Sequence, residues 1–202
     1  MNRRRFIATT LGLAASSVLP AFGQLGQKVE VPLERVIEAY NSQKCPSWCW
    51  AASISMLFEL YGHPIDQRRI AATLYKTPPP CKTSSPSAIL HLINQGWKDD
   101  NGETFHCRTD ALYDQFAGVD NMHPQDIIDS LGSGDPLLLC TTHHCMVLTE
   151  VHYIPTPMGP SLTEMGVADP WPGAGLRSLN AAEGRKVWAG GQLSILASVD
   201  VT

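Results

Sequence analysis

The apolar residues of this 202-residue chain follow a helical period in its front half and form short strand-like runs in its back half. The clearest helical segment is 47–61, whose apolar residues lie at offsets of 0, 4, 7, 8 and 11: Trp50, Ile54, Leu57, Phe58 and Tyr61. Ser47 is suited to cap the start of this helix, and Gly62 is suited to end it.

Three shorter helices are predicted after the first one. Asp66 and Ser85 are suited as N-caps of two of them, and the third covers residues 123–131. Pro86 then occupies the first position of its helix, where a missing N–H costs nothing. This helix is predicted to carry four apolar residues on one side: Ile89, Leu90, Ile93 and Trp97.

Compact apolar runs predict strands at 137–140, 146–148 and 166–168, and the tail 192–201 has a strand-like composition. Helices followed by strands indicate an α+β domain whose two halves face each other. The 44% share of hydrophobic residues is normal for a globular protein, and no repeat period is visible.

Residues 1–23 have the pattern of an export signal. Arg3, Arg4 and Arg5 precede a mild apolar stretch at 7–19, and small residues stand near position 23. The paired arginines followed by Phe6 resemble a twin-arginine signal. We therefore expect a mature domain of residues 24–202 in the periplasm or outside the cell.

The charge of the mature domain argues against a nucleic-acid partner. Without the three arginines of residues 1–23, the 15 basic residues fall to 12 against 19 acidic ones, a net charge of −7. Such a surface repels phosphate backbones. No internal apolar run is long enough to cross a bilayer, so we expect no membrane association after signal cleavage.

The segment 43–53 places Cys49 in the first turn of the longest predicted helix. Unpaired backbone amides and the helix dipole favour a thiolate at this position, which would make the cysteine a nucleophile near neutral pH. Taken alone, a helical cysteine is more often a small buried residue. Gln43, six residues earlier, could bring its side-chain amide beside the thiol.

Two downstream residues could complete a catalytic group. His144 opens an apolar strand, where its imidazole could take the thiol proton. His143 is the rival, since neighbours in a strand point to opposite faces. Asp169 ends a short strand 25 residues after His144 and could accept the second N–H of the imidazole.

The order of these residues resembles the papain-like cysteine peptidase superfamily. Gln43, five intervening residues, Cys49 and Trp50 match its signature, and the Trp-Cys-Trp-Ala-Ala form is similar to compact bacterial branches of the bacteriocin-processing and effector types. Trp171, two residues after Asp169, also fits the family pattern. Trp48 is a departure, because papain itself has a small residue there.

This resemblance implies a two-lobed fold, with a helical N-terminal lobe, an antiparallel β-rich C-terminal lobe and an active-site cleft between them. It implies that Cys49 is the nucleophile, His144 the base and Asp169 the orienting residue, with Gln43 holding the oxyanion. The substrate would be a peptide or protein, cleaved without a metal or organic cofactor. We expect the protein to act as a monomer.

The resemblance also implies a disulfide between Cys45 and Cys81. Cys140 and Cys145 could face each other across a hairpin or be separate thiols, and Cys107 has no evident partner. If Cys49 stays free, the five other cysteines cannot all pair with one another.

Three alternatives remain on the sequence alone. Cys140, His143, His144 and Cys145 could bind zinc, although adjacent histidines diverge and the spacing is poor. A transglutaminase-like acyl transferase also orders Cys, His and Asp, but Gln43 argues against it. A secreted binding module could retain the residues without using them.

Overall fold

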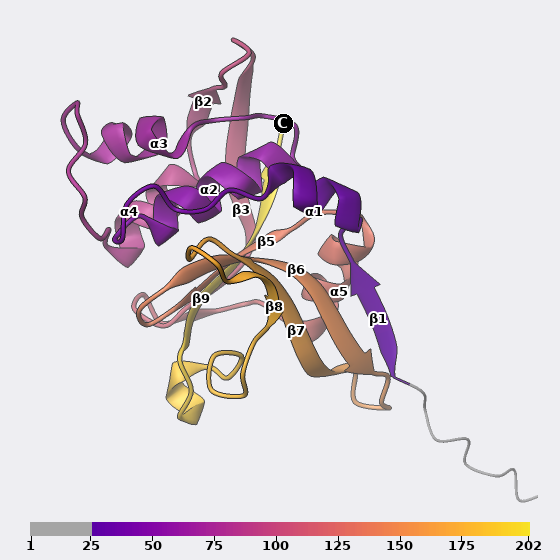
Figure 1. The fold of residues 1–202 in the computed structure, drawn as a ribbon. Helices are drawn as coiled ribbons and strands as arrows, with labels where there is room; N and C mark the ends of the chain where they lie inside the picture. The colour runs from indigo at the N-terminus through magenta and orange to yellow at the C-terminus, as the bar shows by residue number, and fades with distance from the viewer. Residues whose placement is uncertain (1–25) are drawn as a thin grey trace, which may run out of the picture.

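The computed structural model describes residues 26–202, and these form the expected α+β fold (Figure 1). The helices are α1 (Leu33–Ala39), α2 (Cys49–Leu60), α3 (Gln67–Leu74), α4 (Pro86–Leu92), α5 (Pro124–Gly132) and the short 3₁₀ turn η1 (Val187–Ala189). The strands are β1 (Gln27–Glu30), β2 (Gly96–Lys98), β3 (Thr104–Asp114), β4 (Val119–Asp120), β5 (Leu137–Thr141), β6 (Cys145–Ile154), β7 (Ser161–Asp169), β8 (Gly175–Ser178) and β9 (Leu193–Val201).

The strands form one antiparallel sheet in the order β2-β3-β9-β5-β6-β7-β8, with β1 beside β6 and β4 beside β3. Helices α1 to α4 gather on one side of this sheet, and α5 lies apart from them near β1 (Figure 1). The fold therefore consists of a helical layer that packs across a twisted antiparallel sheet, in which β9 lies between β3 and β5.

Helix α2 is the central element of the helical layer. All of its residues are buried except Cys49, which is half-buried, and Glu59. It packs against β5 and β6 on one side and against α1 and α3 on the other, so its apolar surface is wider than the stripe read from the sequence. Gly62 ends the helix with a φ of 85°, a conformation that favours glycine.

The start of α2 differs from the prediction. The expected cap, Ser47, does not occupy that position; Trp48 does, without a side-chain hydrogen bond, and Cys49 is the first helical residue. The reason is a tight turn before the helix, in which the Trp48 N–H donates to the Cys45 carbonyl. The predicted caps Asp66 and Ser85 are confirmed, since each accepts a backbone N–H of its own helix.

The expected order of helices followed by strands was wrong in one region. Strands β2 to β4 lie between α4 and α5, and Trp97 belongs to β2 instead of the helix opened by Ser85. In β3, Phe105, Cys107 and Tyr113 are buried in alternation, but a register shift between Thr109 and Leu112 interrupts the period. This irregularity hid the longest strand from a search for alternating apolar residues.

The predicted export signal, residues 1–23, lies outside the described residues. Within residues 26–202, no helix combines the length and the apolar character needed to cross a bilayer.

Replacing Phe58 by alanine is expected to lower the free energy of unfolding by about 3–5 kcal/mol, because it empties a packed aromatic site. The Phe58 ring is fully buried and meets the rings of Phe105 and Trp97 edge-on at 5.2 and 5.5 Å. Phe116→Ala is the matched control, since this side chain is 60% exposed and its loss should change stability by less than about 0.5 kcal/mol. Urea denaturation measures both, and equal losses would contradict this account of the core.

Candidate active site

The beginning of α2 is fixed to the loop that follows α3. The indole N–H groups of Trp48 and Trp50 donate to the carbonyls of Pro80 and Lys82 at 3.0 and 3.2 Å. The predicted disulfide between Cys45 and Cys81 is confirmed and joins the same two segments. Because of these ties, Cys49 stands at a fixed point on the wall of a pocket.

The turn between β5 and β6 carries His144. Cys140 and Cys145 form a disulfide across this turn, with their Cα atoms 4.0 Å apart. Thr141 closes it further, since its N–H donates to the His144 carbonyl and its hydroxyl oxygen accepts the His144 N–H at 3.1 Å. The turn is thus closed by one covalent bond and by backbone hydrogen bonds on both sides of the histidine.

Cys49, His144 and Asp169 form a continuous line. The Nε2 atom of His144 lies 2.6 Å from Oδ1 of Asp169. Cys49 and His144 line the same pocket, and each shifts the pKa of the other. The ring of Trp171 meets His144 edge-on, with centroids 6.3 Å apart. His143 is exposed, and its side chain makes no hydrogen bond within the described residues, so the structure brings His144 to this line and not its neighbour.

The pKa values of the three groups shift in the directions that charge separation requires. Burial alone would raise the pKa of the Cys49 thiol, but hydrogen bonds from His144 and from the Cys145 backbone lower it overall. Burial likewise opposes the charge on His144, yet Asp169 and then Cys49 raise its pKa to about 9. The carboxyl of Asp169 has a lowered pKa, because the donors facing it outweigh its desolvation. The site favours a thiolate beside an imidazolium.

Gln43 is buried, but its side chain faces backbone carbonyls. Its Nε2 donates to the carbonyls of Cys45 and Pro46 at 3.0 and 2.8 Å, while its Oε1 is buried with no partner. Its backbone N–H donates to the Pro170 carbonyl at 2.8 Å, next to Asp169 in the chain. An oxyanion role for Gln43 therefore requires one amide N–H to leave its carbonyl.

A residue that the sequence analysis missed, Arg177, contacts the other oxygen of Asp169. Its Nε lies 2.8 Å from Asp169 Oδ2. The spacing of the two residues in the sequence could have indicated this contact. If a tight turn joins the two strands, Asp169 and Arg177 lie on the same face of the hairpin, because side chains along a strand alternate between its faces.

A pocket of about 360 Å³ opens beside the thiol. Its walls come from both halves of the molecule and include Cys49, Trp50, Ile89, Phe116, His144 and Ile195. The pocket is largely apolar, and the Cys49 thiol and the His144 imidazole are among the polar groups on its wall.

The zinc alternative for the β5–β6 turn is wrong. Cys140 and Cys145 are joined to each other, so neither sulfur is available as a thiolate ligand. Cys49 and Cys107 are the two free cysteines. Burial and, to a smaller extent, Asp200 raise the pKa of Cys107 to about 12, which leaves it a protonated and inert thiol.

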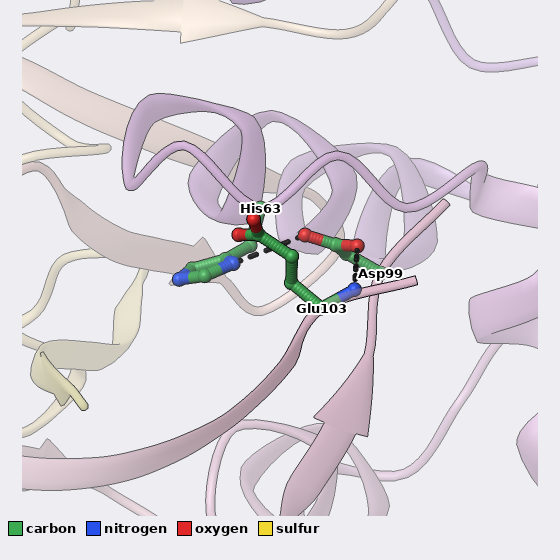
Figure 2. A group of neighbouring side chains, drawn as sticks. All are labelled: His63, Asp99 and Glu103. Atoms are coloured by element: carbon green, nitrogen blue, oxygen red, sulfur yellow. Dashed lines mark hydrogen bonds and ion pairs between the residues drawn. The ribbon is translucent and has the colours of Figure 1, made fainter. Parts of the chain in front are cut away.

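His63, Asp99 and Glu103 form a second group of metal-ligand types (Figure 2). Both oxygens of Asp99 already have donors, since Oδ2 lies 3.1 Å from His63 Nδ1 and Oδ1 accepts the N–H groups of Asn101 and Glu103. The imidazole also stacks on Phe105, with centroids 4.2 Å apart. This group closes the turn between β2 and β3, and its contacts are explained without a ligand.

A thiol at the start of a buried helix and a histidine–carboxylate pair on the facing sheet define the arrangement of a papain-like fold. A family model described as the Peptidase_C39 like family matches residues 29–192, and the chain belongs to this family. Membership points to a peptidase acting on peptides or proteins and agrees with the papain-like resemblance. A search of curated proteins finds no match.

The lowered pKa of Cys49 predicts reaction with iodoacetamide below the pH range of an ordinary thiol, for which the reference pKa is 9.0. The rate should rise through an inflection below this value, because the thiolate forms beside the His144 imidazolium, which persists up to a pH of about 9. Mass spectrometry of the labelled peptides measures the rate at each pH. Cys107 serves as an internal reference and should stay unlabelled, and an inflection for Cys49 at or above the ordinary value would contradict the ion pair.

Proposed function

We propose that this protein is a cysteine peptidase that hydrolyses peptide bonds through Cys49, His144 and Asp169, assisted by Gln43. The observation that carries the proposal is that Cys49 and His144 share the wall of one apolar pocket, while His144 is hydrogen-bonded to Asp169 behind it. The match to the Peptidase_C39 like family supports the same reaction class.

In the proposed reaction, the Cys49 thiolate attacks the carbonyl carbon of the scissile peptide. The new oxyanion accepts hydrogen bonds from the Cys49 backbone N–H and from the Gln43 side-chain amide. For this, the amide breaks one of its two hydrogen bonds to backbone carbonyls. The His144 imidazolium donates its proton to the leaving amine as the C–N bond breaks. Water, deprotonated by the imidazole, then hydrolyses the thioester and returns the thiol.

Asp169 has a distinct part in this scheme. Its carboxylate accepts the Nε2–H of His144, which directs the other ring nitrogen toward Cys49 and stabilises the imidazolium. It touches neither the substrate nor the sulfur, so its contribution is orientation and charge.

We further propose that residues 1–23 direct export and that the peptidase domain, residues 24–202, acts as a monomer in the periplasm or outside the cell. The disulfides Cys45–Cys81 and Cys140–Cys145 support this, because such bonds persist in oxidising compartments.

Cys49→Ala is expected to abolish covalent labelling by an electrophilic cysteine-peptidase probe, since it removes the only thiol of lowered pKa. Cys107→Ala is the matched control, because it removes the other free thiol, which is buried and protonated. Intact-protein mass spectrometry counts the probe molecules bound. Labelling that survives Cys49→Ala and is lost in Cys107→Ala would overturn the nucleophile assignment.

His144→Ala is expected to lower kcat/KM by at least about 100-fold, because proton transfer is lost. Asp169→Ala should cost less, since orientation contributes less than the proton transfer it supports. A proteome-derived peptide library treated with the native protein and with Cys49→Ala identifies a cleaved sequence, on which both variants are compared. A larger loss in Asp169→Ala would contradict these roles, and transfer of an added amine in place of hydrolysis would indicate an acyl transferase.

A further inference from the structure

We infer that Arg177, held by Glu183, is a positioning residue that fixes the Asp169 carboxylate for its contact with His144. This inference rests on the proposed function and adds a fifth and a sixth residue to its site. The pair acts through Asp169 and touches neither the sulfur nor the pocket beside it.

The contacts of Asp169 leave its carboxylate little freedom. Oδ1 accepts from His144 at 2.6 Å and from the Trp171 backbone N–H at 2.8 Å, while Oδ2 accepts from Arg177 Nε at 2.8 Å. Donors on both oxygens prevent rotation about the Cβ–Cγ bond. Only Oδ1 faces the imidazole. The Arg177 donor on Oδ2 therefore helps to set the direction in which Oδ1 points.

Arg177 is itself fixed on its far side. Its NH1 and NH2 groups form a fork on the two oxygens of Glu183 at 2.9 and 2.7 Å, and NH2 also lies 3.2 Å from the Met146 sulfur. Glu183 in turn accepts the Asn180 backbone N–H at 2.9 Å. The guanidinium therefore bridges two carboxylates, a contact that the single ammonium group of lysine cannot reproduce.

The strand register explains why this residue can reach Asp169. In the β7–β8 hairpin Asp169 pairs with Gly175 and Val167 pairs with Arg177, so Arg177 is the diagonal neighbour of Asp169 on the same face. Gly175 has no side chain to come between them.

Because the charges of Arg177 and Glu183 cancel, the pair acts by orienting Asp169 more than by adding charge to the site. Arg177 and Glu183 together carry no net charge, so the guanidinium adds little repulsion to the nearby imidazolium. The groups that face Asp169 are His144 from the β5–β6 turn, Arg177 from β8 with Glu183 behind it, and Tyr40, whose hydroxyl donates to the Asp169 backbone carbonyl at 3.0 Å. Removing the ion pair as a unit thus frees the carboxylate without changing the net charge.

The test is the charge-neutral double variant Arg177→Met, Glu183→Gln. A loosely held Asp169 stabilises the imidazolium less, so the pKa of His144 falls from about 9 toward its ordinary value and that of Cys49 rises. We expect the alkaline limb of the kcat/KM profile to shift to lower pH and the inflection of iodoacetamide labelling to shift to higher pH, each by about one pH unit. We also expect kcat to fall about tenfold, with KM nearly unchanged.

Two further variants complete the design. Arg177→Lys keeps the charge but cannot contact both carboxylates. It should therefore shift the same two pH limits in the same directions, by a smaller amount. This variant decides the question if the double variant does not fold. The matched control is Arg108→Met, Asp200→Asn, which removes an exposed ion pair between β3 and β9 and should leave both limbs in place.

The outcomes separate this inference from the proposed function. A lower melting temperature with unchanged pH limbs would mean that the pair only stabilises the hairpin, and a wild-type profile in Arg177→Lys would mean that charge alone matters; either result overturns the inference. If iodoacetamide labelling of Cys49 in the native protein shows no inflection below the ordinary thiol pKa, the proposed function fails instead.

Discussion

The hydrogen bond between His144 and Asp169 is the interaction on which the rest of the site depends. It joins the turn before β6 to the end of β7, and so connects two neighbouring strands at the edge that faces α2. Because Asp169 binds Nε2 of the imidazole, Nδ1 can stay on the side of the Cys49 thiol. The sheet thus supplies a positive charge, the His144 imidazolium, which stabilises the thiolate more than the start of the helix alone would.

Other bonds keep the helical layer and the sheet in register around this contact. Tyr40 and Gln43 donate to the carbonyls of Asp169 and Pro170, and Tyr61, at the end of α2, donates to the Val199 carbonyl at 2.9 Å. Backbone carbonyls of the sheet are thus fixed by side chains and N–H groups from the helical half. The relative position of thiol and imidazole follows from these ties and from the packing of α2.

The sequence predicted the elements whose signals are local. The capping residues Asp66 and Ser85 and the helical period of α2 lie within single segments, and the disulfide between Cys45 and Cys81 followed from the family resemblance. Strand β3 was missed because a bulge breaks its alternation, and Arg177 because its partner is set by hairpin register, which no single segment carries. The carbonyl contacts of Gln43 depend on a turn whose shape comes from tertiary packing.

The place of β9 between β3 and β5 has a consequence for how the protein is assembled. The helix that carries the Cys49 sulfur is synthesised early, whereas the sheet that carries His144 lacks the strand beside β5 until residues 193–201 have been made. Pairing across such a distance along the chain is slow compared with helix formation. A partly folded chain can therefore contain the Cys49 helix before the sheet that positions His144 is complete, and the lowered pKa of the thiol requires that complete sheet.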